Sequence, residues 1–318
     1  MKVLIIGGTG FLGQYLVNRL KKHKITAASR RGLVNPIFPI DKFATIHKGV
    51  DITKSETLRP LIKKADIVIN LAACLSFRRR DKDLLLAINN QGVLNILKLC
   101  EENNVKKFIH ISSIAAFGYN DQIIDETHEY DWCKEKNCVY SYSKSLPDNQ
   151  VLSSTCNTTI VYPGLILGPG DPVNTKKMIT AIKDQKIPLM PPGETSVIDV
   201  RDLVEAIALL LDSKVCNQKF LVSGQNIKYA ELLSTIAKVT KSKPPSIVMS
   251  RFLMYPLLFF ARILETVKKD PPLTYENIYT SFHTRRFNMD KICKLGFKPG
   301  FPLERTIHDS WRWIQNEK

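Results

Sequence analysis

The chain has 318 residues, 44 % of them hydrophobic, so it can bury the core of one large domain or two closely packed ones. Its 46 basic and 30 acidic residues give a net charge of +16, but it carries no zinc-finger, basic-zipper or RNA-binding motif, and nucleic acid is excluded as a partner. Among the seven cysteines there is no CxxC pair, and Cys133 and Cys138 lack the second pair that a zinc site needs. We therefore expect a reduced, cytoplasmic protein without a bound metal or a signal peptide.

The chain opens with a strand, a glycine-rich turn and a helix. Residues 1–6 are a short apolar run, typical of a strand buried on both faces, and apolar side chains recur at helical spacing from Leu12 to Leu20. Between them, Gly7 would allow a tight turn, Gly10 would let the backbone approach a pyrophosphate, and Gly13 would let the helix pack close to the strand. The free N–H groups of the helix start attract phosphate. This stretch predicts a dinucleotide-binding turn; the alternative is a glycine-rich turn without a ligand.

The second predicted strand, 24–29, is followed by two arginines. Proteins that bind NAD usually place an acidic residue here to hold the ribose 2′-OH, whereas a guanidinium suits a 2′-phosphate. Residues 1–60 also carry 11 basic and 3 acidic side chains. Arg30 and Arg31 therefore favour NADP over NAD, and the alternative is two arginines in a surface loop.

Helices and strands then alternate. The pattern predicts a helix over 55–64, a strand over 66–73, a helix over 83–103 and a strand over 108–111. This alternation predicts a parallel sheet that binds ligands at the carboxyl ends of its strands. The small residues Ala72 and Ala73 end one strand, and Ser112 and Ser113 follow the next. Asn89 interrupts the apolar side of its helix, where a buried amide needs partners.

A tyrosine and a lysine follow at helical spacing. Tyr140 and Lys144 are four residues apart and would share one face of a helix. Such pairs are common on exposed helices, so the weight of this one comes from its position, 27 residues after Ser113 and downstream of the dinucleotide turn. Pro147 predicts a kink or break in the helix. A strand over 158–164 ends in Pro163 and a glycine.

The last third has a looser pattern. A helix ending near 211, a strand over 219–222, a helix over 229–239 and a final tryptophan-containing helix are predicted. The stretch 247–264 is apolar, but its uncharged core of about ten residues is about half of a bilayer span. We interpret it as a helix packed in a smaller domain or as the wall of an apolar cleft. Peripheral docking on a membrane is the alternative.

Together these motifs resemble the extended short-chain dehydrogenase/reductases of the NAD-dependent epimerase/dehydratase superfamily, especially the dihydroflavonol reductase and 3β-hydroxysteroid dehydrogenase branch. The resemblance covers nearly the whole chain and is specific over its first two-thirds. It rests on Gly7 to Gly13, Asp51-Ile52, Leu71-Ala72-Ala73, Asn89 with Gly92, Ser112-Ser113, Tyr140 with Ser143-Lys144, and Val200-Arg201-Asp202. It implies a doubly wound α/β Rossmann domain, residues 1–162 and 197–225, and a smaller, mostly helical substrate-binding domain, residues 163–196 and 226–318.

The resemblance also implies a role for each matching residue. Tyr140 would be the general acid/base, and Lys144 would favour its phenolate and bind the nicotinamide ribose. Ser113 would hydrogen-bond the substrate oxygen, with Ser112 as the alternative, and Asn89 would support Lys144 through water. The implied cofactor-binding residues are Gly7, Thr9, Gly10, Phe11, Leu12, Gly13, Arg30, Arg31, Asp51, Ile52, Leu71, Ala72, Ala73, Tyr140, Lys144 and Pro163.

The activity implied is that of an NADP(H)-preferring oxidoreductase acting on a secondary alcohol or ketone of a hydrophobic small molecule. The first alternative is an NDP-sugar epimerase or dehydratase with tightly bound NAD, against which Arg30 argues. The second is a non-enzymatic nucleotide-binding sensor or assembly subunit, although such proteins usually lose the tyrosine or the lysine. Dimers are common in this family, and the sequence shows no interface.

Overall fold

Seven parallel strands form the central sheet of this computed structural model, which describes residues 1–33, 36–132, 135 and 137–316. The strand order is β11-β7-β5-β4-β1-β2-β3, so the chain reverses direction across the sheet between β1 and β4, where open α/β sheets bind their ligands. The strands are β1 (Lys2–Ile6), β2 (Lys24–Ser29), β3 (Ala44–Lys48), β4 (Ile67–Asn70), β5 (Lys107–Ile111), β7 (Thr158–Pro163) and β11 (Gln218–Val222).

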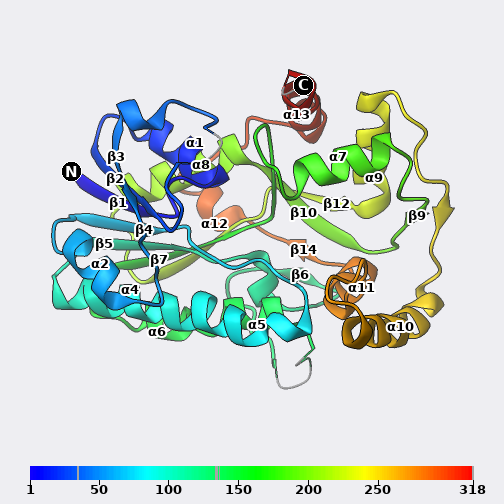
Figure 1. Cartoon of the computed structure of the whole chain (residues 1–318), viewed down its shortest axis with the longest axis horizontal. Helices are drawn as coiled ribbons and strands as arrows, with labels where there is room; N and C mark the ends of the chain where they lie inside the picture. Colours follow the sequence, from blue (N-terminus) through cyan, green and yellow to red (C-terminus); the bar gives the residue numbers. More distant parts are fainter. Residues whose placement is uncertain (34–35, 133–134, 136, 317–318) are drawn as a thin grey trace.

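Helices cover both faces of this sheet, which is why strands such as β1 and β4 are apolar except for one terminal residue (Figure 1). One face packs on α1 (Phe11–Arg19), α8 (Val200–Asp212) and α12 (Asp290–Cys293). The opposite face carries α2 (Ser55–Ile62), α3 (Lys82–Leu85), the π-helical turn η3 (Leu86–Gln91), α4 (Gly92–Glu102), α5 (Val139–Ser145) and α6 (Asp148–Leu152).

A second sheet, β8-β10-β12, forms the other half of the molecule (Figure 1). Its strands are β8 (Leu165–Leu167), β10 (Glu194–Asp199) and β12 (Gln225–Lys228), and its core packs against α7 (Thr175–Lys183), α9 (Tyr229–Thr240) and α13 (Leu303–Asn316).

Smaller elements complete the described chain. Helices α10 (Met254–Val267) and α11 (Tyr275–Phe282) pack on each other in a separate apolar cluster. Two short strand pairs join β9 (Leu189–Met190) to β13 (Ile247–Val248) and β6 (Ile123–Ile124) to β14 (Arg286–Phe287). Four 3-10 turns are η1 (Ile40–Lys42), η2 (Arg79–Asp81), η4 (Ile114–Phe117) and η5 (Arg251–Leu253).

The fold confirms the predicted Rossmann sheet and the break at Pro147, which separates α5 from α6. Strand β3 was not predicted, because it is a half-buried edge strand without an apolar run. Strand β10 was missed because its buried residues include the polar Thr195, Ser196 and Asp199. The predicted strand over 66–73 is wrong in its end, because β4 stops at Asn70.

The stretch 247–264 contains the predicted helix, but the helix begins later than predicted. Residues 247–248 form β13, and α10 begins only at Met254 and continues to Val267. Pro256 falls in its first turn, where a missing backbone N–H breaks no helical hydrogen bond. The helix also has one packed face only, since Leu258 and Ala261 are its buried residues. The domain boundaries stay a prediction, although β11 returns to the central sheet after β8 and β10 have formed the second one.

Candidate active site

A cavity of about 400 Å³ lies at the carboxyl ends of β1 to β4. Loops after four strands meet there, as the strand order requires at the point where the chain reverses direction. The cavity brings together ten predicted cofactor-binding residues: Gly7, Thr9, Gly10, Arg30, Arg31, Asp51, Ile52, Leu71, Ala72 and Ala73. The other six predicted cofactor-binding residues are not among its lining residues: Phe11, Leu12, Gly13, Tyr140, Lys144 and Pro163.

The glycines of the first turn have the geometry that the sequence predicts. Gly7 has φ +85°, and a Cβ there would lie 3.0 Å from the backbone nitrogen of Ala72. A Cβ on Gly13 would lie 2.4 Å from the carbonyl oxygen of Gly7, so the close packing of α1 on the turn requires glycine. Gly10 occupies the N-cap of α1 and has no side chain to cap the first turn, which leaves N–H donors for an anion. The cradle thus fits a dinucleotide pyrophosphate.

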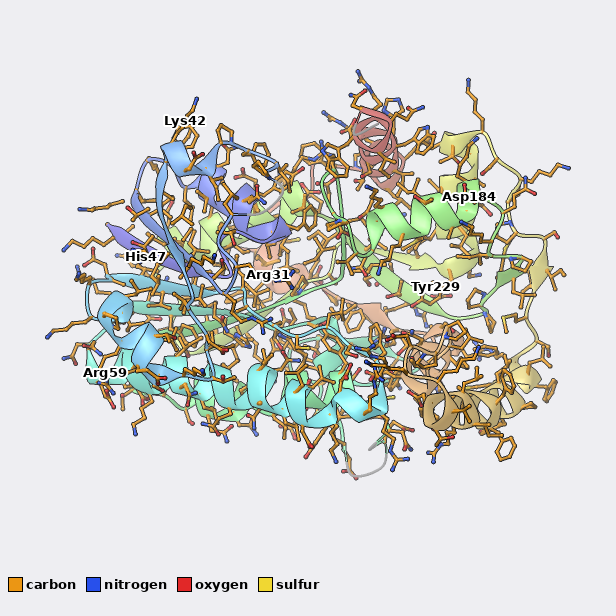
Figure 2. All side chains as sticks on the ribbon, viewed as in Figure 1. Arg31, Lys42, His47, Arg59, Asp184 and Tyr229 are labelled. Carbon is orange, nitrogen blue, oxygen red and sulfur yellow. The ribbon has the colours of Figure 1, made fainter. Side chains whose placement is uncertain are left out.

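Both arginines after β2 lie at the cavity. They are exposed, and no carboxylate of the described residues forms an ion pair with either of them. Arg31 lies near the middle of the molecule in Figure 2. The hydroxyl of Ser29 fixes the loop that carries them, because it accepts hydrogen bonds from Thr9 Oγ1 (2.7 Å) and from the N–H of Gly32 (3.0 Å). Two unpaired cations at this edge fit an additional phosphate.

Asp51 lines the same cavity after β3. A hydrogen bond from the backbone N–H of Thr53 lowers the pKa of its carboxyl, and the charge of Arg30 lowers it further. The carboxylate also accepts a hydrogen bond from Thr53 Oγ1 at 2.8 Å. Asp51 is therefore ionised at neutral pH, and its oxygens fix the turn that brings Ile52 to the cavity.

The proposed catalytic side chains converge between β5 and α5. The side chain of Ser113, which follows β5, lies close enough to the hydroxyl of Tyr140 to lower the pKa of that phenol. Lys144 is buried one turn further along α5 and donates to the carbonyl oxygen of Ile111 at 3.1 Å. Ser112 instead points its hydroxyl at the carbonyl oxygen of Lys144, 3.2 Å away. Ser113, and not Ser112, is therefore the serine beside the tyrosine hydroxyl.

Burial shifts the pKa values of both side chains. Desolvation raises the pKa of Tyr140 to about 12, although the nearby Ser113 side chain lowers it. Desolvation lowers the pKa of Lys144 to about 8, and the charge of Asp148 acts in the opposite direction. At neutral pH the phenol thus carries its proton and the amine is mostly charged.

Asn89 sits in the π-helical turn η3, which interrupts the long helix where the sequence pattern breaks. Its amide oxygen accepts from the N–H of Cys74 (2.8 Å), and its amide nitrogen donates to Ser143 Oγ (3.0 Å) and to the carbonyl oxygen of Cys74 (3.0 Å). Asn89 thus ties the loop after β4 to the residue that precedes Lys144. Its support of Lys144 through water stays a prediction.

Three features of the site were not predicted. Glu276 of α11 accepts hydrogen bonds from the N–H groups of Tyr140 and Ser141, both at 2.8 Å, and burial raises its pKa to about 7. The ring of Phe77 packs edge-on against that of Tyr140, with centroids 5.4 Å apart. Asp148, at the start of α6, accepts a hydrogen bond from the hydroxyl of Tyr162 at 2.8 Å, and burial raises its pKa to about 7. No motif marks these residues.

The described residues contain no cluster of histidine, cysteine or acidic side chains able to hold a metal ion. Cys133 lies outside the described residues, whereas Cys138 is a free, buried thiol. Within the described ranges, no helix is long and apolar enough to cross a membrane.

Residues 3–223 match the model of the NAD dependent epimerase/dehydratase family, so the chain belongs to this family. The chain is thus an enzyme of this family, whose members among the relatives named below include dehydrogenases and epimerases.

Curated relatives include sterol enzymes and a nucleotide-sugar epimerase. The chain is 24 % identical to the sterol demethylase protein B of Methylococcus capsulatus, over 92 % of this chain and 87 % of that protein. It is 22 % identical to a decarboxylating sterol-4-alpha-carboxylate 3-dehydrogenase of Schizosaccharomyces pombe, over 100 % of this chain and 99 % of that protein. It is also 28 % identical to a UDP-glucose 4-epimerase of Vibrio cholerae, over 76 % of each.

Solved structures share the fold. The dTDP-glucose 4,6-dehydratase DesIV of Streptomyces venezuelae, with NAD and TYD bound, superposes with a TM-score of 0.80 over 99 % of this chain and 97 % of that one, at 16 % identity. This likeness concerns the arrangement of the backbone alone.

Proposed function

We propose that the protein is an NADP(H)-preferring oxidoreductase that interconverts a secondary alcohol and a ketone on a hydrophobic substrate. The observation that carries this proposal is the position of Ser113 beside the Tyr140 hydroxyl, one helical turn from the buried Lys144, at the carboxyl ends of the strands that also form the dinucleotide cavity. A bound nicotinamide nucleotide would supply or accept the hydride.

The side chains of the site would donate the proton and stabilise the charge that its transfer leaves behind. With a pKa of about 12, Tyr140 holds its proton at neutral pH and can donate it to a carbonyl oxygen as that oxygen gains charge. Ser113 would hold the same oxygen through its hydroxyl. Lys144 would stabilise the phenolate that remains, because its ammonium lies on the same face of α5. In the oxidation direction the proton moves the opposite way.

The unpaired Arg30 and Arg31 at the cradle support the preference for NADP. A 2′-phosphate would provide the anion that these guanidinium groups lack, and Arg30 stays the first candidate to bind it.

An apolar substrate is supported by the surroundings of Tyr140 and by the relatives. The Phe77 ring against Tyr140 gives the site an apolar wall, and two relatives carry sterols in their names. A sterol-like or cyclic ketone is therefore the substrate class that we propose.

A nucleotide-sugar epimerase or dehydratase with retained NAD is the second candidate. It is favoured by the UDP-glucose 4-epimerase among the relatives and by the basic charge of the chain, which suits a diphosphate substrate. The two candidates differ in the cofactor and in whether it dissociates.

The decisive experiment starts with the purified protein before any addition. The protein is denatured, released nucleotide is identified by chromatography, and native protein is titrated with NADPH and NADH. An empty protein that binds NADPH more tightly supports the reductase. Stoichiometric NAD that survives purification would overturn it in favour of the epimerase. The reductase should then turn over sterols or cyclic ketones. If these compounds reacted only at background rates while sugar nucleotides reacted rapidly, the proposed hydrophobic substrate class would be wrong.

Arg30→Ser tests the basis of the cofactor preference. Loss of a charged hydrogen bond should weaken NADPH binding about tenfold or more and leave NADH binding within about twofold. The matched control is Arg59→Ser, because Arg59 pairs with Glu102 and lies far from Arg31 in Figure 2. Equal losses for both nucleotides would make Arg30 a residue of the general cofactor site rather than of 2′-phosphate selection.

A further inference from the structure

Helix α10 has two apolar faces, and only one of them is covered. Leu258 and Ala261 are buried against Ile278 and Phe282 of α11. On the other side of the helix, and on the turn η5 that precedes it, a stripe of large apolar side chains faces solvent at spacings of three and four residues. The exposed fractions are 90 % for Phe252, 73 % for Tyr255, 70 % for Phe259, 45 % for Ile263 and 77 % for Val267. We call these five residues the outer stripe.

The outer stripe lies at the edge of the molecule. Figure 1 shows α10 as the outermost helix of its corner, with α11 between it and the rest of the fold. Leu253 and Phe260, within the same stretch of chain, are exposed as well. Scattered exposed hydrophobic residues are ordinary, but a contiguous patch rich in aromatic side chains marks a surface that binds something.

The charges around the outer stripe indicate what it binds. Asp270, just after α10, is paired with Arg78, and residues 251–269 contain four basic side chains and a single acidic one, Glu265. That carboxylate is turned inward, where it accepts a hydrogen bond from the N–H of Arg79 at 3.4 Å and is partly desolvated. An apolar face with flanking cations complements a bilayer that carries anionic lipids. A second copy of the chain fits less well, since it would bring two sets of cations together.

We propose that the outer stripe of α10 docks the protein peripherally on an anionic lipid bilayer. The helix has 14 residues and would lie in the plane of the interface, with Phe252 and Phe259 among the acyl chains and Arg251, Lys268 and Lys269 at the headgroups.

Docking would also orient the candidate active site. The N–H of Arg79, in the turn η2, contacts Glu265 of α10, and Phe77, two residues earlier, packs on Tyr140. The rim of the site and the docking helix are therefore neighbours, and a docked protein would present that rim close to the lipid. Binding itself does not depend on the proposed reaction, so it can be measured without a substrate.

The test is co-sedimentation of the full chain with vesicles of phosphatidylcholine, alone or mixed with phosphatidylglycerol. We expect binding to the mixed vesicles, weaker binding to phosphatidylcholine, and release by salt. Phe252→Ser with Phe259→Ser should weaken binding about tenfold or more, because two aromatic anchors leave the interface. The matched control is Phe43→Ser with Ile123→Ser, which removes one exposed aromatic and one exposed aliphatic side chain away from α10. Circular dichroism and NADPH binding report that each variant is folded.

Lys268→Gln with Lys269→Gln isolates the contribution of charge and should reduce the salt-sensitive part of binding. Absence of binding to the mixed vesicles would overturn the proposal, as would unchanged binding by the double phenylalanine variant. A dimer in solution that the same variant dissociates, without any vesicle binding, would also overturn it and assign the stripe to an interface between copies.

Discussion

The chemistry proposed here depends on the proton of one phenol. Tyr140→Phe removes the hydroxyl that lies beside Ser113 but keeps the ring that packs on Phe77. We expect kcat to fall by about 10²–10⁴-fold, the usual contribution of a general acid/base, with NADPH affinity nearly unchanged. Tyr142→Phe is the matched control, since Tyr142 lines a different cavity beside α6. Full turnover by Tyr140→Phe would exclude the assigned mechanism.

Asp148 should control the pH dependence through Lys144. Its negative charge raises the pKa of Lys144 against the effect of burial, so Asp148→Asn should lower that pKa further below about 8. The alkaline limb of the profile of kcat/KM against pH should then move to lower pH, because the charged amine is lost earlier. Tyr162→Phe should move the limb the same way, since the hydrogen bond from Tyr162 lowers the pKa of Asp148 and keeps it ionised. If the alkaline limb did not move in either variant, the charge of Asp148 would not control the pKa of Lys144.

Sequence reasoning succeeds at residues that carry a local pattern and fails at those that do not. Gly7 and Gly13 are predictable because a turn of this kind leaves no room for a Cβ, and Tyr140 with Lys144 because a helix puts them on one face. The Asp148–Tyr162 hydrogen bond joins a helix to a strand, and only the fold shows that Tyr162 points at this carboxylate.

At the scale of elements, the active-site helix α5 is held by a helix from the far end of the chain. Helix α5 has seven residues, and its N-cap, Cys138, makes no side-chain hydrogen bond to the first turn. The carboxylate of Glu276 on α11 satisfies the N–H groups of Tyr140 and Ser141 instead, and also Ser141 Oγ at 2.7 Å. The sequence pattern predicts a helix near Tyr140, but a contact between residues so far apart in the chain leaves no periodic signal.

Glu276→Gln should therefore loosen α5. The amide keeps one acceptor but places N–H donors against the backbone N–H groups, so we expect a loss of about 1–3 kcal/mol in the free energy of unfolding by urea. Because Tyr140 is displaced with the helix, kcat should fall more than NADPH affinity. The matched control is Glu231→Gln, an exposed glutamate in the first turn of α9. A stability loss with unchanged kcat would make Glu276 purely structural.

At the scale of the whole molecule, the sequence predicts the parallel sheet well and the C-terminal part poorly. The strands β1 and β4 are apolar except for one terminal residue each, because helices cover both faces of the sheet, and such runs are visible without a fold. The second sheet, in contrast, carries buried polar residues such as Asp199, whose partners come from elsewhere in the chain. The stability of the second sheet therefore depends on residues distant in the sequence, which a local pattern does not reveal.

Arg201 is the residue that connects the two parts. Its guanidinium binds the fully buried carboxylate of Asp199 at 2.7 Å, pairs with Asp309 of α13 at 2.7 Å and stacks on Phe301 at 3.7 Å. Next to it, Asp202 accepts the N–H groups of Gly300 and Phe301. The C-terminal helix and the loop before it are thus attached to α8 and β10 through the Arg201 guanidinium, the Asp202 carboxylate and a hydrogen bond from Thr306 Oγ1 to Asp199.

Arg201→Met should destabilise the molecule strongly and at its C-terminal end first. The substitution keeps much of the packing volume but removes the cation that pairs with the buried Asp199 carboxylate. Only Thr306 Oγ1 and the backbone N–H of residue 201 then remain as hydrogen-bond donors to that carboxylate. We expect the free energy of unfolding to fall by about 3–5 kcal/mol, as for other buried ion pairs that lose one partner. Because Trp311 and Trp313 lie on α13, fluorescence should report unfolding at lower urea than far-ultraviolet circular dichroism does. The matched control is Arg19→Met, whose exposed ion pair with Glu205 should contribute at most about 1 kcal/mol. If the two arginine variants unfolded alike, the C-terminal helix would be held by its apolar contacts with α7 and α9 and not by Arg201.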